Sequence, residues 1–204
     1  MSATQLRRVL IIVGFAFIFG RSASAGAVQN LFTKTLCPLY ANRGDNNAIG
    51  SATPGTPLAV DAASPTSHGR QRVILRGWSP TAATSVLYQA PDVRIVLAKF
   101  LTNNNAERTV LHQKTDSYGM VWQQVSISVW IPTTMIVNNV SVVWARAQTL
   151  YDNRCGSCHA LHKPSDFTAN EWPGILDAMA KNAAFDPAQT ELVTKYLQTH
   201  ARPN

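Results

Sequence analysis

The chain has 204 residues, with 18 Lys and Arg against 11 Asp and Glu, and its formal net charge at pH 7 is +7. This length accommodates one domain of ordinary size or two small ones. The basic residues form no clustered stripe with interleaved aromatic side chains, so the sequence argues against nucleic acid as a partner.

Residues 1–25 have the pattern of a secretory signal. A pair of arginines at 7–8 precedes an apolar run at 9–19, and Ala-Ser-Ala at 23–25 offers a cleavage site. A membrane span needs about 20 apolar residues, so this run is too short to cross a bilayer. We therefore predict cleavage and a periplasmic protein, with an uncleaved membrane anchor as the alternative. Cleavage leaves 15 basic against 11 acidic residues, a net charge of +4.

Residues 26–52 are polar and turn-rich, which predicts a poorly ordered lead-in or a loop-rich first hairpin. They include Cys37, the odd one of three cysteines. In an exported protein an odd cysteine indicates a free thiol or a bridge between two chains. We favour an unpaired thiol without a function.

From 53 to 140 the pattern is that of short β-strands. Val86–Lys99 and Gln123–Val129 alternate in polarity, and the segments 103–105 and 117–119 supply turns. Segments 72–80 and 124–132, which lie 52 residues apart, share a pattern that ends in Trp-x-Pro and predicts an internal repeat. The pattern resembles bacterial SH3-like barrels, which implies one or two small barrels here.

Three tryptophans of this region have two interpretations. Trp78, Trp122 and Trp130 could form an aromatic patch that binds a ligand, as in peptide-binding barrels. They could equally supply most of the apolar area in the core of a tiny barrel. We favour core residues, because a small barrel has few other large side chains to bury.

Residues 141–204 change to helical periodicity. A first helix over about 142–154 carries Val143, Ala147, Leu150 and Tyr151 on one face. A capping box at 168–171 predicts the start of a second helix. Asp186-Pro187-Ala188-Gln189 has the N-cap, N1 proline and N3 glutamine of a third.

The segment Cys155-Gly156-Ser157-Cys158-His159 is the one Cys-x-x-Cys-His of the chain and is typical of covalent haem attachment. Two thiols three positions apart can each bond a vinyl group of one porphyrin, and His159 then reaches the iron as proximal ligand. A redox dithiol or half of a zinc site could also use Cys-x-x-Cys. The sequence offers neither a βαβ context nor a second ligand pair. We therefore predict one covalent haem c.

The sequence leaves several candidates for the distal iron ligand. Met179 lies in the middle of the second predicted helix and is the first choice, although a methionine there could simply fill the core. His200 near the end of the chain and an open site are the alternatives. His162 is three residues beyond His159, too close to cross the plane of the ring.

Several segments together resemble the C-terminal region of the pentahaem c-type cytochromes of trimethylamine N-oxide respiration. They are 86–91, 118–132, 143–151, 155–162, 167–174 and 179–181, and the match covers roughly residues 80–200. The resemblance implies a monohaem outlet that passes electrons to a periplasmic molybdenum reductase. This sequence has no further haem motifs corresponding to the tetrahaem part, so it implies a separate carrier with an external electron donor.

Taken together, the fold class expected is α+β and multidomain, with one or two SH3-like β-barrels at 53–140 and an all-α class I-type cytochrome c domain at 141–204. The function expected is electron transfer to a partner oxidoreductase, without enzymatic chemistry of its own. The alternative is a haem-bearing sensory or regulatory module whose β region binds a partner.

Overall fold

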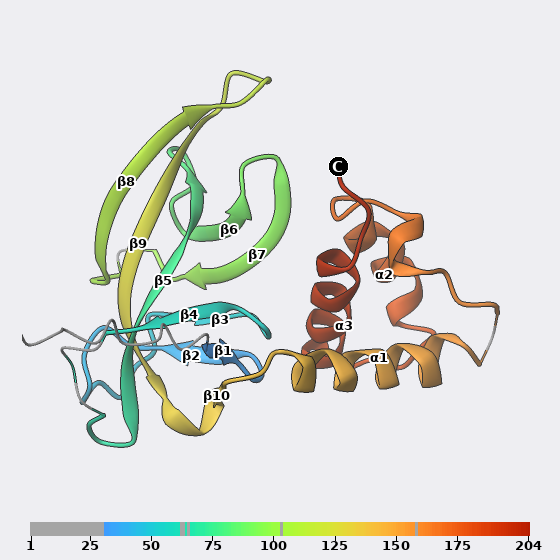
Figure 1. Cartoon of the computed structure of the whole chain (residues 1–204), viewed down its shortest axis with the longest axis horizontal. Coiled ribbons are helices and arrows are strands. Elements are labelled where there is room, and N and C mark those ends of the chain that lie inside the picture. Colours follow the sequence, from blue (N-terminus) through green and yellow to red (C-terminus); the bar gives the residue numbers. More distant parts are fainter. Residues whose placement is uncertain (1–30, 62–63, 65, 103, 158) are drawn as a thin grey trace, which may run out of the picture.

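The structure, a computed structural model, describes residues 31–61, 64, 66–102, 104–157 and 159–204. The predicted signal and the first residues of the lead-in lie outside the described residues, and so does Cys158. Figure 1 shows two parts, a curled sheet and a group of helices that follows it in the chain. More described residues lie in strands than in helices.

The strands of the described chain form one ten-stranded sheet in which every pairing is antiparallel. Its order is β10-β1-β4-β5-β6-β7-β3-β2, and β9 pairs with both β5 and β8. An isolated bridge between Tyr40 and Trp130 brings the end of β2 back to β9 as the sheet curls. The strands are β1 (Leu31–Thr33), β2 (Cys37–Leu39), β3 (Gly50–Ala52), β4 (Pro57–Val60), β5 (Arg70–Pro80), β6 (Val86–Ala90), β7 (Val93–Phe100), β8 (Glu107–Thr115), β9 (Val121–Pro132) and β10 (Ile136–Val137).

Strands β5 and β9 make the longest pairing in the described sheet. They pair without interruption from Arg70↔Pro132 to Pro80↔Trp122. Successive side chains of a strand point to opposite faces, so alternate apolar residues of both strands reach the same interior. The core side chains from these two strands are Val73, Leu75, Val125, Ile127, Val129 and Ile131.

This arrangement corrects the predicted fold class. Segments 72–80 and 124–132, interpreted as copies in two small barrels, are neighbouring strands of one sheet. They look alike because both alternate apolar and polar residues over the same core. The structure is mostly β, with a sheet curled into a half-barrel and three α-helices. The expectation of SH3-like barrels followed by an all-α class I-type cytochrome c domain was therefore wrong.

The tryptophan prediction holds in part. Trp122 is buried, donates from Nε1 to Asp116 Oδ2 at 2.8 Å and meets the Tyr88 ring edge-on at 5.7 Å between centroids. Trp78 and Trp130 are only half-buried. Their positions alternate with the inward-facing residues of β5 and β9, so they lie on the opposite face of the sheet from its core.

The α-helices are α1 (Ser141–Cys155), α2 (Trp172–Ala180) and α3 (Pro187–Thr199), and short 3₁₀ turns lie at Thr133–Met135 and Pro164–Asp166. The first and third begin where the sequence predicts. The second begins later than its capping box, although Thr168 does bond Glu171 Oε2 through both N–H and Oγ1. Pro173 explains the shift, because proline is tolerated in the first turn of a helix and not beyond it.

The helices pack against each other and against the sheet. Their own apolar cluster centres on Trp172, Leu176, Val193 and Leu197. Trp144 of α1 reaches back to the 53–56 turn, where the backbone at Gly55 has a φ of +70° and lies against the indole. Thus α1 is tied to the sheet by its first turn.

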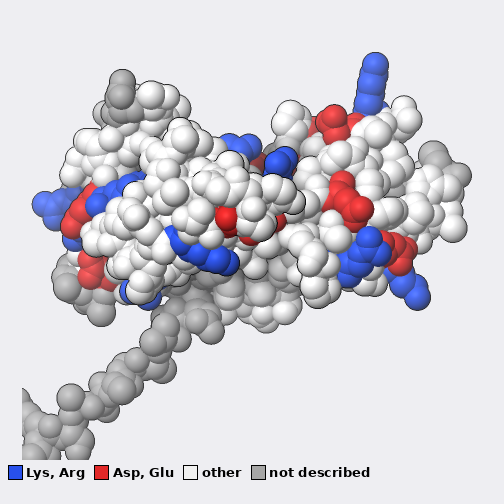
Figure 2. All heavy atoms as spheres, turned by 90° about the horizontal axis from the view of Figure 1, so that it is seen from above, with Lys and Arg blue, Asp and Glu red and all other residues white. Residues whose placement is uncertain are grey.

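In the part of the chain that the structure describes, no helix is long and apolar enough to cross a membrane. Figure 2 views the molecule from above, and on that face basic and acidic side chains are interspersed over both parts.

Candidate haem site

Helix α1 delivers the first motif cysteine into the helical cluster. Val143, Ala147, Tyr151 and Cys155 follow one another at intervals of four residues, and all four are buried. Residues four apart lie on one face of a helix. Cys155 therefore extends the buried stripe of α1 by one more turn, and 8% of its surface is exposed.

The residue after this cysteine must be small. Gly156 closes the helix, with its N–H donating to Asp152 O at 3.2 Å. A Cβ at this position would lie 2.5 Å from the same oxygen, which is closer than real Cβ atoms come. Ser157 donates from Oγ to Arg154 O at 3.0 Å. The chain thus turns tightly out of the helix within the motif.

His159 emerges from this turn with an exposed ring. Its Nδ1 lies 2.7 Å from Ala160 O, so the neutral ring with its proton on Nδ1 donates to that carbonyl. This tautomer leaves the lone pair of Nε2 for a metal. A backbone carbonyl on the far nitrogen is the common support of an iron-binding or zinc-binding histidine.

Two buried side chains hold the loop that follows His159. Tyr151 donates its hydroxyl to His162 O at 2.9 Å, and Trp172 donates Nε1 to Pro164 O at 2.8 Å. Burial raises the pKa of Tyr151 to about 12, so the phenol keeps the proton that it donates. The two rings meet edge-on at 6.4 Å, and Phe167 packs on Trp172 at 5.0 Å. Aromatic packing and hydrogen bonds therefore fix the loop next to the motif.

The candidate distal ligands lie in different surroundings. Met179 is half-buried on α2, one turn beyond the buried Leu176. His200 follows α3, where its ring packs on Tyr196 at 4.6 Å and on Trp144 at 5.8 Å. His162 lies beside Asp166, with 3.8 Å between Nδ1 and Oδ2.

Among the described residues, no group of three or more His, Cys, Asp or Glu side chains is arranged to hold a metal ion. Cys37, the odd cysteine, lies in the core of the sheet with none of its surface exposed. Burial raises the pKa of its thiol to about 12. This thiol is inaccessible in the folded chain.

Helix α3 also contains two buried polar residues that the sequence analysis missed, Lys195 and Gln198. Apolar periodicity identifies the face of a helix that packs on its helical neighbours. It gives no sign of a second contact, and α3 makes one with strand β7 through these polar side chains.

A buried motif cysteine at a helix end, followed by a histidine whose Nδ1 is held by a carbonyl, is the arrangement of a c-type cytochrome. Comparison with known proteins agrees with this class. The chain belongs to the TorC third cytochrome c domain family, which matches residues 25–136. The dihaem cytochrome c family matches residues 151–204, the part that contains the motif. These matches to cytochrome c families confirm the predicted resemblance.

The curated relatives are longer than this chain. TorC of Escherichia coli K12 is 27% identical over 183 residues, which are 89% of this chain and 46% of TorC. TorY of Escherichia coli O157:H7 is 28% identical over 156 residues, 76% of this chain and 41% of TorY. The chain therefore spans less than half the length of these relatives. No solved structure matches it.

Proposed function

We propose that this chain is a periplasmic electron carrier with one haem c, bonded through Cys155 and Cys158 and ligated by His159 and Met179. The observation that carries the proposal is the buried position of Cys155, beside a loop whose carbonyls are held by Tyr151 and Trp172. When bound, haem supplies reversible one-electron chemistry. The chain itself binds and orients the group, so we propose a carrier and not an enzyme.

The residues around the motif fit a porphyrin. Cys155 belongs to an apolar cluster to which Leu161, Phe167 and Trp172 also contribute. Burying a flat apolar macrocycle against such side chains stabilises the complex by roughly 25 cal/mol per Å² of apolar surface removed from water. We propose residues 141–204 as the haem-bearing part of the chain.

The position of Met179 supports its role as distal ligand. Trp172, Leu176 and Met179 are separated by four and three residues, and residues at this spacing share a helix face. The first two are buried in the helical cluster, and Met179, which is half-buried, follows them along the same face of α2. A thioether ligand raises the reduction potential of the iron relative to a second imidazole.

The proposed acceptor is a periplasmic molybdenum N-oxide or S-oxide reductase. TorC and TorY are the relatives to which the chain is similar, and the resemblance found in the sequence implies trimethylamine N-oxide respiration. A carrier of single electrons also needs a donor, and we propose a separate upstream redox protein for that role.

Covalent attachment is tested by producing the chain together with the c-type cytochrome maturation machinery. After denaturation, the polypeptide should retain a pyridine haemochrome, and the Cys155→Ala, Cys158→Ala double variant should retain none. Colourless wild-type protein would contradict the proposal.

The axial ligands are tested by spectroscopy. Met179→Ala should abolish the thioether-to-iron charge-transfer band at the red end of the ferric spectrum, whereas Met120→Ala, at an exposed position of the sheet part, should keep it. The ferrous wild type should not bind carbon monoxide. Ready binding would favour the sensory alternative instead.

The acceptor is tested by mixing the ferrous protein with purified trimethylamine N-oxide reductase and its substrate. Haem absorbance should return to the ferric form only when enzyme and substrate are both present. Without such reoxidation, this acceptor would be excluded.

A further inference from the structure

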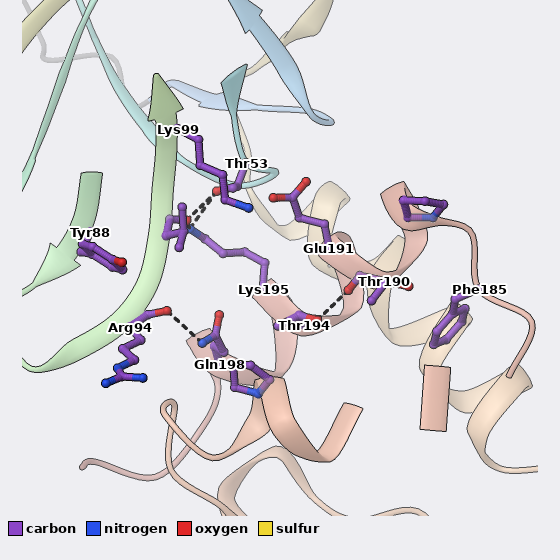
Figure 3. A pocket seen from close by; sticks show the side chains of 13 residues that line it. Thr53, Tyr88, Arg94, Lys99, Phe185, Thr190, Glu191, Thr194, Lys195 and Gln198 are labelled. Atoms are coloured by element: carbon purple, nitrogen blue, oxygen red, sulfur yellow. Dashed lines mark hydrogen bonds between the residues drawn. The ribbon is translucent and has the colours of Figure 1, made fainter. Parts of the chain in front are cut away.

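A cavity lies between the sheet and helix α3. It has a volume of about 700 Å³ and opens between β7 and α3 (Figure 3). Small-molecule sites have volumes of roughly 300–1,000 Å³, so this cavity has the size of a ligand site. No described residue of the haem motif lines it, so it is distinct from the candidate haem site.

Lys195 lines the cavity and links helix α3 to the sheet. Its side chain runs from α3 toward β7, where Nζ donates to Thr53 Oγ1 at 3.0 Å and to Val96 O (Figure 3). Only 4% of the residue is exposed. Both acceptors are neutral, so the hydrogen bonds satisfy the amine without balancing its charge.

This buried amine lacks a counter-ion among the described residues, since no described carboxylate lies within 4.0 Å of it. Glu191, one turn earlier on α3, lines the cavity at a greater distance. Burial lowers the pKa of Lys195 to about 7, and the weaker attraction of Glu191 acts in the opposite direction. A buried charge without a partner is unfavourable, and an anion next to it removes that penalty.

The rest of the lining favours an anion with an apolar body. Arg94 and Lys99 are exposed residues of β7 that line the cavity, so with Lys195 it has three basic side chains against the one carboxylate of Glu191. Such an excess attracts anions. The walls between these charges are largely apolar or aromatic and include Tyr88, Val96, Pro173, Phe185 and Pro187.

We propose that this cavity binds a small organic carboxylate with an aromatic or aliphatic body. The carboxylate pairs with Lys195, Arg94 and Lys99 guide it in, and the apolar body lies against Val96 and Phe185. The charge excess disfavours cations, and a neutral analogue leaves Lys195 without a counter-ion.

Calorimetric titration of the full haem-loaded chain with 2-naphthoate tests this proposal, with 2-naphthamide as the neutral analogue of the same shape. At pH 8 the carboxylate should bind at least tenfold more tightly than the amide. Lys195→Met should weaken naphthoate binding at least tenfold, whereas Lys114→Met, on the exposed strand β8, should leave it unchanged. Equal affinities for acid and amide, or no binding at millimolar concentration, would overturn the proposal.

Two further measurements cover the case in which Lys195→Met folds poorly. Arg94→Gln and Lys99→Gln are exposed changes, and each should weaken naphthoate binding severalfold. Titration in two buffers with different ionisation heats should also show proton uptake at pH 8, because an adjacent carboxylate raises the pKa of Lys195. Binding without proton uptake and without dependence on Arg94 or Lys99 would place the probe elsewhere.

Discussion

Replacing Gly55 with alanine tests the contact between the sheet and Trp144 of helix α1. The substitution has two costs, one from the backbone conformation and one from the collision with the indole. The backbone at Gly55 has a φ of +70°, and a Cβ there would lie 2.2 Å from the Trp144 ring. The left-handed conformation costs an alanine about 1–2 kcal/mol. Overpacking a buried contact costs about 1–3 kcal/mol more. Gly55→Ala should therefore lower the free energy of unfolding by about 2–5 kcal/mol, a large share of the ~5–15 kcal/mol of a typical protein.

Gly69 is the matched control for this change. Its φ is +69°, and a Cβ there would meet nothing within 4 Å. Gly69→Ala should have only the cost of the left-handed conformation, so its free energy of unfolding should fall by about 1–2 kcal/mol. Urea denaturation followed by far-ultraviolet circular dichroism measures both losses.

The Trp144→Leu variant completes a double-mutant cycle. With the indole removed, Gly55→Ala should be no more harmful than Gly69→Ala. Equal losses for the two glycine variants in the presence of Trp144 would refute the contact between α1 and the 53–56 turn.

Three further predictions concern single groups. The pKa of Lys195 is near 10.5 in the unfolded chain and about 7 in the folded chain. Between these values the unfolded chain binds more protons, so the free energy of unfolding should rise from pH 7 to 8.5 by up to about 2 kcal/mol. Urea titrations at both pH values should show this rise in the wild type and not in Lys195→Met. Cys37 should react with a thiol reagent only after unfolding, and labelling of the native haem-loaded protein would contradict its burial. Asp186 accepts from Gln189 N at 2.7 Å, so Asp186→Ala should lose about 1 kcal/mol in urea denaturation and Asp186→Asn much less.

Features determined by neighbouring residues could be predicted from the sequence. Asp186, Pro187 and Gln189 start α3 where expected, because a cap depends on a few adjacent residues. The turn at 117–119 likewise joins β8 to β9, with Asp116 Oδ1 accepting from the N–H groups of Tyr118 and Met120. The buried stripe of α1 followed from apolar periodicity alone.

Features that depend on distant contacts could not be predicted in this way. The pairing of β5 with β9 joins residues 42 to 62 positions apart, and two strands that share a core have similar patterns whether they pair or lie in separate barrels. Lys195 resembles an ordinary solvent-exposed helix residue until β7 is placed beside it. The roles of Cys155, Cys158, His159 and Met179 in holding haem all stay predictions.

Thr53 connects parts of the chain that lie far apart in sequence, through its hydroxyl and its carbonyl. Thr53 accepts a hydrogen bond from Lys195 of α3 and donates to Val96 O at 2.7 Å, and its own carbonyl accepts from Thr33 of β1 at 2.5 Å. A fluctuation that frees α3 therefore also loosens the first described strand. Amide hydrogen exchange should accordingly find the end of α3 and the start of the sheet opening together, as one cooperative unit.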